Sequence, residues 1–198
     1  MTDQQAALNS QADYQAITGL RYIADYITEA EQERIIEIID AQAWQNDLKR
    51  RVQHYGYKYD YKKRFIDFEM YLGALPEWLL MLSQKLVQDR LVSDLPDQVI
   101  VNEYLPGQGI SSHVDCVPCF DDTIVSLSLN SFCVMEFTHT QSAQKIPVLL
   151  EPRSVVVLQG ESRYNWKHGI ASRKIDVFNN TTIRRARRLS LTFRKIVH

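Results

Sequence analysis

Residues 188–194 read RLSLTFR, and every second residue of this stretch is apolar. Because neighbouring side chains of a strand point to opposite faces, Leu189, Leu191 and Phe193 share one face. The other face carries Arg188, Ser190, Thr192 and Arg194. The pattern predicts a strand whose apolar face packs beneath helices and whose polar face lines the inside of a rolled sheet. A solvated strand face with basic side chains is the simpler alternative.

Other strand signals lie before this stretch, and two helices precede them. The strand-like segments are residues 98–104, 123–130, 133–139, 146–151 and 154–159. A capping box of Thr28 and Glu31 predicts one helix start, and Pro76 predicts a second helix over Glu77–Leu91. Helices set apart from antiparallel strands predict an α+β or mainly β fold: a double-stranded β-helix, or jelly roll, backed by N-terminal helices. The length fits a single domain over residues 1–198.

A His-x-Asp motif, His113 and Asp115, follows the 98–104 strand after a Pro-Gly-Gln-Gly turn. Residues 110–115 return to extended chain in this interpretation, so the two side chains point to one face. The motif is short and carries little weight by itself. The distant His168 adds a second imidazole. Two imidazoles and one carboxylate on one face of a metal are the ligand set expected of non-haem Fe(II) oxygenases. The sequence therefore predicts an iron site.

The arginines at positions 188 and 194 predict a binding site for an acidic co-substrate. They lie roughly 20 Å apart along a strand that rises about 3.3 Å per residue, and their long side chains close most of that gap. A guanidinium at each end suits a small dicarboxylate, because its planar fork pairs with both oxygens of a carboxylate. Asn102 and Tyr104 would offer an amide and a phenol to the same ligand, although alone they are ordinary strand residues.

In order and spacing, the motifs of this chain resemble those of the AlkB-like 2-oxoglutarate- and Fe(II)-dependent dioxygenases. They are N-x-Y at 102–104, P-G-x-G-I at 106–110, H-x-D at 113–115, G-E-S-R-Y at 160–164, H-G-I at 168–170 and the arginine pair, so the resemblance covers about residues 50–197. It implies that His113, Asp115 and His168 form the catalytic centre and bind Fe(II). It also implies that Asn102, Tyr104, Arg188, Ser190 and Arg194 hold 2-oxoglutarate.

The chemistry implied by this resemblance uses O2 and converts 2-oxoglutarate to succinate and CO2 while a substrate C–H bond is hydroxylated. A hydroxylated carbon attached to a base nitrogen is lost as formaldehyde, which repairs the base. A hydroxyl on a carbon attached to carbon stays, which modifies the base.

Residues 49–64, KRRVQHYGYKYDYKKR, hold the main evidence about the substrate. Basic side chains interleaved with tyrosines suit phosphate contact and base stacking. In the AlkB-like enzymes the corresponding segment is a nucleotide-recognition lid over a single-stranded or flipped base. The expected substrate contacts are Arg50, Arg51, His54, Tyr55, Tyr57 and Arg163, with Trp166 a weaker candidate and Arg184, Arg185 and Arg187 an extension of the surface or a plain loop. The alternative for residues 49–64 is a twisted hairpin with solvated charges.

One position separates this chain from the branch of the family that repairs DNA. Members resembling AlkB itself carry an acidic residue two positions after the iron-binding Asp, and this chain has Val117 there. RRVQHYGY and GESRYxWxHGI are closer to the branch that hydroxylates a modified wobble uridine in tRNA. The RNA-recognition and methyltransferase domains of that branch are not expected within 198 residues. We therefore expect either tRNA base hydroxylation or oxidative dealkylation repair of DNA or RNA, with a protein hydroxylase or demethylase, or a non-catalytic nucleic-acid-binding module, as alternatives.

Bulk properties set few further limits. The formal net charge is −1, so only local clusters can attract a polyanion. No apolar run is long enough to span a membrane, and we expect a monomeric, cytoplasmic protein with no membrane partner. The three cysteines argue against a disulfide framework. Cys116 and Cys119 form a C-x-x-C that predicts a zinc site, a redox-active pair or plain loop cysteines.

Overall fold

The strands form two antiparallel sheets and a separate hairpin. The computed structural model of the protein describes residues 14–46, 49–60, 65, 66 and 68–197. Its elements, in chain order, are β1 (Leu20–Ile23), α2 (Glu29–Asp40), β2 (Val52–Tyr55), η1 (Phe68–Met70), α3 (Glu77–Gln88), β3 (Gln98–Tyr104), β4 (Ile110–His113), β5 (Phe120–Leu129), β6 (Cys133–His139), β7 (Lys145–Leu150), β8 (Val155–Leu158), α4 (Glu161–Tyr164), β9 (Trp166–Ile170), β10 (Ile175–Phe178), β11 (Thr181–Arg184) and β12 (Arg188–Ile196).

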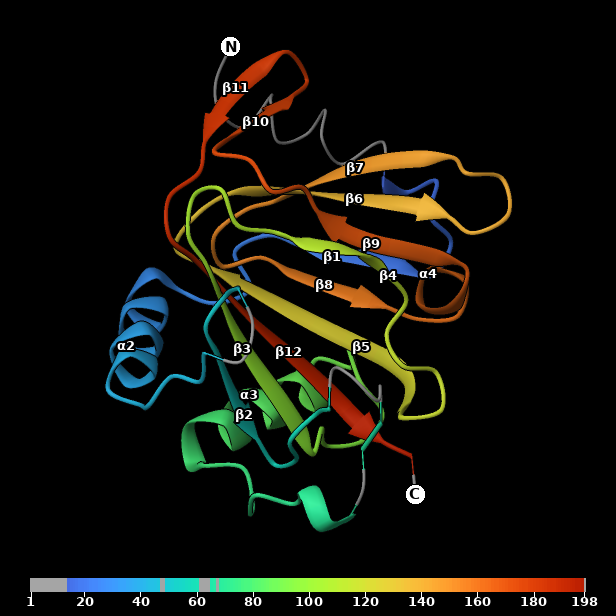
Figure 1. Cartoon of the computed structure of the whole chain (residues 1–198). Helices are drawn as coiled ribbons and strands as arrows, with labels where there is room; N and C mark the ends of the chain where they lie inside the picture. Colours follow the sequence, from blue (N-terminus) through green and yellow to red (C-terminus); the bar gives the residue numbers. More distant parts are fainter. Residues whose placement is uncertain (1–13, 47–48, 61–64, 67, 198) are drawn as a thin grey trace.

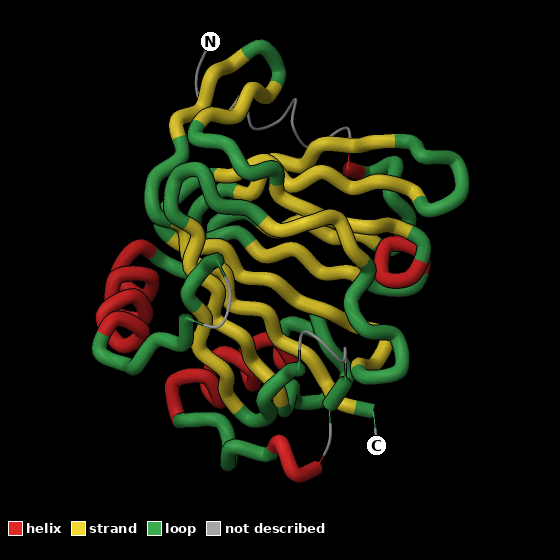
Figure 2. The backbone as a smooth tube through the Cα atoms, in the orientation of Figure 1, coloured by secondary structure: helices red, strands yellow, loops and turns green. Residues whose placement is uncertain are grey.

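The two larger sheets are the walls of a roll. The first has the strand order β1-β8-β5-β12-β3-β2, and the second has the order β4-β9-β6-β7 (Figure 1). The hairpin β10–β11 stands at one end of the molecule, and helices α2 and α3 lie on the outside of the strands (Figure 2). This arrangement confirms the predicted jelly roll with helices behind it.

The strand β12 separates two hydrophobic cores, as its alternating sequence predicts. Leu189, Leu191 and Phe193 are buried in the core that the larger sheet shares with α2 and α3. A second core, which includes Phe137 and Trp166, lies between the two sheets. The polar side chains of β12 point toward this second core and line a cavity there. The register of β12 therefore decides which residues reach the interior of the roll.

The two helices begin where the sequence predicts. The Thr28 hydroxyl accepts a hydrogen bond from the Glu31 amide at 3.2 Å, and the Glu31 carboxylate accepts one from the Thr28 amide at 2.7 Å. These bonds satisfy amides that have no partner inside the helix. Helix α3 follows Pro76 but ends at Gln88, and the prediction of an end at Leu91 is wrong. Arg90 takes a left-handed backbone conformation (φ 56°), which no helix can continue.

Other differences from the prediction concern short elements. Strand β4 ends at His113, so Asp115 lies in the loop after the strand and not on it. Strands β1, β2, β10 and β11, of four residues each, were not predicted as strands from the sequence. None of the helices within the described part of the chain has the length and apolarity needed to span a bilayer.

Candidate active site

A cavity of about 630 Å³ opens between the two sheets. The large sheet contributes its inward polar side chains, and the small sheet contributes two histidines. A third group comes from the chain around β2, where Lys49, Arg50 and Tyr59 also line the cavity. The site therefore combines residues that are more than a hundred positions apart in the sequence.

The candidate metal ligands come from adjacent strands and the loop that follows one of them. His113 of β4 and His168 of β9 are direct cross-strand partners, and their ring centroids lie 4.6 Å apart. One nitrogen of each imidazole lies 3.9 Å from an oxygen of Asp115. These three are the only His, Cys, Asp or Glu side chains gathered closely enough to hold a metal in the described part of the chain, with ligand atoms within 4.8 Å of one another. The predicted iron triad is thus brought together.

A close approach of the backbones makes this pairing possible. A Cβ atom on Gly169 would lie 2.8 Å from the Cα of Ser112, so only glycine fits beside His168 at this point. The His113 Nδ1 lies 2.8 Å from the Ser111 carbonyl oxygen. Because a carbonyl only accepts, this contact holds the proton on Nδ1 and leaves the Nε2 lone pair facing Asp115.

The electrostatics of the triad favour the protonation states that a metal needs. Burial would raise the pKa of Asp115, but the Arg194 guanidinium, followed by His168 and His113, holds that pKa well below its ordinary range. Burial, reinforced by His113, lowers the pKa of His168 to about 4. At neutral pH the site therefore offers a carboxylate and a neutral imidazole, the forms that bind a divalent cation.

The predicted co-substrate residues line the same cavity. The guanidinium of Arg194 donates to Asp115 Oδ1 at 2.9 Å and to Gln98 Oε1 at 3.2 Å. At the other end of β12, Arg188 donates to the Ser128 hydroxyl at 2.7 Å. Ser190 and its cross-strand partner Asn102 lie between the two arginines, and Tyr104 lies opposite Arg188. Burial raises the pKa of Tyr104, so its phenol keeps its proton and can donate a hydrogen bond.

Five buried polar atoms of residues that line this cavity have no hydrogen-bond partner among the described residues. They are Asp115 Oδ2, His168 Nδ1, Arg188 Nε, Arg188 Nη1 and Arg194 Nε. Buried polar atoms ordinarily have partners, and apart from the imidazole nitrogen these are a negative oxygen beside two imidazoles and three guanidinium N–H donors. The donor set fits a divalent cation at the triad and an anion between the arginines.

Residues 40–194 match the protein family described as the 2OG-Fe(II) oxygenase superfamily. The chain belongs to this superfamily. It is therefore a 2-oxoglutarate- and Fe(II)-dependent dioxygenase that uses O2, as the resemblance of its motifs implies. The match extends from the end of α2 to Arg194 and includes the three triad residues and both arginines.

The relatives of this oxygenase include proteins named for tRNA and for DNA. It is 38% identical to the tRNA (carboxymethyluridine(34)-5-O)-methyltransferase alkbh8 of Xenopus tropicalis over 91% of this chain and 32% of that one. It is 37% identical to the alkylated DNA repair protein ALKBH8 homolog of Arabidopsis thaliana over 91% of this chain and 59% of that one. The oxygenase thus spans between a third and three fifths of these two relatives. The solved structure of OsALKBH1 matches 89% of this chain and 96% of its own, with a TM-score of 0.68 and 20% identity, which supports the fold.

Arg163, predicted to contact the substrate, lies below the active-site loop of the oxygenase instead of at its surface. The side chain is 2% exposed. Its guanidinium donates to the backbone carbonyls of Asp115 at 3.0 Å, Cys116 at 3.2 Å and Phe120 at 3.4 Å. These bonds hold the loop that carries Asp115, so the structure gives Arg163 a structural role. Trp166 is likewise buried, with its ring edge-on to His139.

The same loop contains a disulfide between Cys116 and Cys119. Each sulfur is bonded to the other, so neither is a thiolate that could bind zinc, and the zinc alternative is wrong. The sequence argued only against a disulfide framework, and this single link joins two cysteines of one loop. Cys133 is a buried free thiol. Val117, between the paired cysteines, is half-exposed.

Among the predicted substrate residues of segment 49–64, one lines the cavity and the other four pack against other parts of the fold. Arg50 reaches the cavity. Arg51 forms a two-pronged ion pair with Glu103, with contacts of 2.6 and 2.7 Å, and lies over the Trp44 ring. His54 is buried, Tyr55 packs edge-on against Trp78, and Tyr57 packs against Tyr71. Residues 61–64 of the predicted lid lie outside the described residues.

Within residues 49–64, Lys49 and Tyr59 line the cavity although neither was singled out from the sequence. Tyr59 packs against Phe120 with ring centroids 5.8 Å apart. The alternation of 49–64 is too weak to distinguish Tyr59 from Tyr55 and Tyr57, so the sequence offers no signal for this choice.

The second basic cluster is largely engaged within the fold. Arg185 is buried and pairs with Asp176 at 2.6 Å, and Arg187 pairs with Glu103 at 2.7 Å and with Asp40. Arg184 is exposed. Of these three arginines, Arg184 alone forms no ion pair with another described residue.

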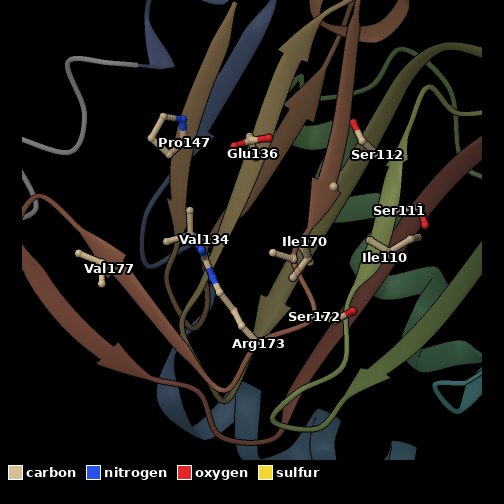
Figure 3. A pocket seen from close by; sticks show the side chains of 12 residues that line it. Ile110, Ser111, Ser112, Val134, Glu136, Pro147, Ile170, Ser172, Arg173 and Val177 are labelled. Atoms are coloured by element: carbon tan, nitrogen blue, oxygen red, sulfur yellow. The ribbon is translucent and has the colours of Figure 1, made fainter.

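A further cavity of about 490 Å³ lies on the outer face of the small sheet (Figure 3). It is lined by β4, β6 and β9 side chains such as Ser112 and Glu136, which point away from the roll. None of the candidate metal ligands lines it. The chemistry of the oxygenase therefore belongs to the inner cavity.

Proposed function

We propose that this dioxygenase oxidises modified or alkylated nucleobases, either by hydroxylating a tRNA base or by oxidative dealkylation of DNA or RNA. One observation carries the proposal: the triad and the arginine pair share a cavity that Lys49, Arg50 and Tyr59 also line. Positive charge beside an aromatic ring suits a nucleotide, whose phosphate and base need one of each.

In this proposal His113, Asp115 and His168 hold Fe(II) and form the catalytic centre. When bound, iron with O2 and 2-oxoglutarate supplies the oxidising power that converts a C–H bond to an alcohol. The protein residues hold and orient the reactants. The contact of Ser111 with His113 and the bonds of Arg163 under Asp115 keep two of the three ligands in place.

The five co-substrate residues divide between the two ends of 2-oxoglutarate. Arg188, Asn102 and Tyr104 would bind the carboxylate that lies away from the iron, with a guanidinium, an amide and a phenol as donors. Arg194, already within 2.9 Å of Asp115, would bind nearer the metal. Ser190 lies between the arginines on β12 and hydrogen-bonds the Ser126 hydroxyl at 3.0 Å.

Residues 49–64 would act as the nucleotide-recognition lid of one domain that spans residues 1–198. Arg50, Lys49 and Tyr59 would contact the flipped or single-stranded nucleotide directly, because they reach the cavity. Arg51, His54, Tyr55 and Tyr57 would support the lid from their packed positions. Arg163 is left out of the substrate contacts because it is buried under the loop.

Of the two proposed reactions, hydroxylation of a tRNA base is favoured over dealkylation of DNA or RNA. Relatives that are 36–38% identical over 90–91% of this chain are named for a wobble carboxymethyluridine of tRNA. Val117 also places an apolar side chain at the position where the AlkB-like repair enzymes carry an acid. The expectations of a monomer and of a cytoplasmic location stay predictions.

Succinate formation tests the proposal. The purified protein with Fe(II) and 2-oxoglutarate should form more succinate when bulk tRNA or a methylated oligonucleotide is added. His113→Ala should abolish this activity. Mass spectrometry of tRNA nucleosides from cells with and without the gene would then identify a missing hydroxylated uridine. No stimulation by either nucleic acid, together with turnover of a protein substrate, would contradict the proposal and favour a protein hydroxylase or demethylase.

A further inference from the structure

Arg50 lies where the proposed lid meets the proposed co-substrate site. Its Nε–H donates to Asn102 Oδ1 at 2.8 Å, across 52 residues of sequence. Asn102 is buried on β3, between Val52 of β2 and Ser190 of β12 in the sheet. The contact joins a cavity-lining side chain of the segment before β2 to one of β3.

This contact fixes which way the Asn102 amide points. An arginine side chain has only donors, so the atom that faces Arg50 must be the amide oxygen. The amide nitrogen, with its two hydrogens, is then directed away from Arg50. A carboxylate only accepts, so the orientation set by Arg50 is the one that lets Asn102 donate to 2-oxoglutarate.

Arg50 also lies beside the phenol of the same site. The central carbon of its guanidinium is 5.6 Å from the centroid of the Tyr104 ring, and that of Arg188 is 5.5 Å from it. Tyr104 therefore contacts two guanidinium groups, and both bring positive charge to the end of the cavity where the proposed distal carboxylate would bind.

We propose that Arg50 is a positioning residue of the co-substrate site, which orients Asn102 and thereby strengthens 2-oxoglutarate binding. The inference rests on the proposed co-substrate residues and deepens their assignment. It gives the lid segment a second role, because the residue that meets the nucleotide also arranges the donors for 2-oxoglutarate. Binding of 2-oxoglutarate would thus hold the start of the lid against the large sheet.

Calorimetric titration of 2-oxoglutarate into the Mn(II)-loaded protein, with no nucleic acid present, tests this role. Arg50→Met keeps an unbranched side chain as far as the Nε position and removes the donors, so 2-oxoglutarate affinity should fall roughly tenfold, as for loss of a hydrogen bond made by a charged group. Arg50→Lys should also bind more weakly, because it lacks the Nε–H. Arg34→Met on the exposed face of α2 makes the same exchange away from the cavity and should leave the affinity unchanged.

A double-mutant cycle separates positioning from a general loss of charge. In an Asn102→Ala background, Arg50→Met should cost little further 2-oxoglutarate affinity, because the amide that it orients is gone. Equal losses in both backgrounds, or an unchanged affinity in Arg50→Met, would overturn the role of Arg50. Arg188→Gln tests the site itself: if it binds 2-oxoglutarate as the native protein does, the proposed co-substrate site is wrong, whatever Arg50 does.

Discussion

The sequence predicts which side chains of β12 face the site, but it does not predict the role of Arg163. The arginines of β12 are separated by a spacing that strand geometry turns into a shared direction. Arg163 acts through bonds to main-chain carbonyls that lie more than 40 residues away. No side-chain pattern marks carbonyl groups, so its location beside the candidate metal ligand His168 suggested a substrate contact that burial excludes.

The bonds of Arg163 lead to a prediction about stability. Arg163→Met should lower the free energy of unfolding by about 3 kcal/mol, because it leaves buried carbonyls of the Asp115 loop without donors. Urea unfolding of the two proteins measures the difference. A loss below about 1 kcal/mol would show that water or other donors replace the guanidinium. Arg153→Met, at an exposed ion pair with Asp25, is a control that should cost much less.

Among the elements, the helix starts were predictable because their signals are local. The capping box of Thr28 and Glu31 spans four residues and needs no tertiary information. The four-residue strands β1 and β2 lie at the edges of the large sheet, and their pairing partners decide that they are strands. Strand β4 ends at His113, where the loop that carries Asp115 begins. The alternation of apolar and polar residues cannot indicate where that loop begins.

The capping box can be tested directly. Thr28→Ala should reduce the free energy of unfolding by about 1 kcal/mol, since an amide at the start of α2 loses its acceptor. Thr28→Ser keeps the hydroxyl and should be nearly neutral. Chemical denaturation measures both, and equal stabilities for all three proteins would contradict the role of the box.

The hairpin β10–β11 depends on one buried carboxylate. Asp176 is fully buried, pairs with Arg185 and Arg173 at 2.6 Å each, and accepts a hydrogen bond from the Val134 amide. Burial would raise the pKa of Asp176, but these contacts, with the Arg185 hydrogen bond the largest, hold it below its ordinary value. Asp176→Asn should therefore cost about 3 kcal/mol at neutral pH, because it leaves Arg185 buried without its partner.

The pH dependence of this ion pair has a definite sign. A carboxyl whose pKa is lowered by folding stabilises the protein above its unfolded pKa of about 4, and that contribution is lost as the pH falls through the folded pKa. The stability gap between the native protein and Asp176→Asn should therefore be constant near neutral pH and shrink below about pH 4. Thermal unfolding at several pH values measures the gap, and a gap that grows toward acid would contradict the assignment.

At the scale of the whole molecule, the jelly roll and the location of its cavity were predictable, whereas the order of the strands was not. Alternation identifies inward residues such as Arg188 and Arg194, and a rolled sheet has one interior. The strand order depends on pairings across the chain, such as that of β12 with β3, which lie about 90 residues apart. No local pattern encodes these partners, so the neighbours of Arg50 could not be predicted.

Ligand binding should stabilise the whole molecule. With Mn(II) in the site, 2-oxoglutarate at about a hundred times its Kd should add about 2.7 kcal/mol to the native state. For a chain of this size that corresponds to a rise in Tm of roughly 5–10 °C. Arg188→Gln should show little of this rise under the same conditions. Differential scanning fluorimetry measures both, and an unchanged Tm for the native protein would contradict the proposed site.

The place of β12 has a consequence for the order in which the protein is made. It lies between β5 and β3 in the large sheet, yet the ribosome synthesises it after every other described strand. Until it emerges, the group β1-β8-β5 and the pair β3-β2 have no strand to join them. Between the synthesis of β5 and that of β12 the nascent chain therefore has two sheet edges without their partner strand, and such edges are open to wrong pairing. A cell that makes this enzyme needs to shield those edges until the arginines of its active site arrive with the last strand.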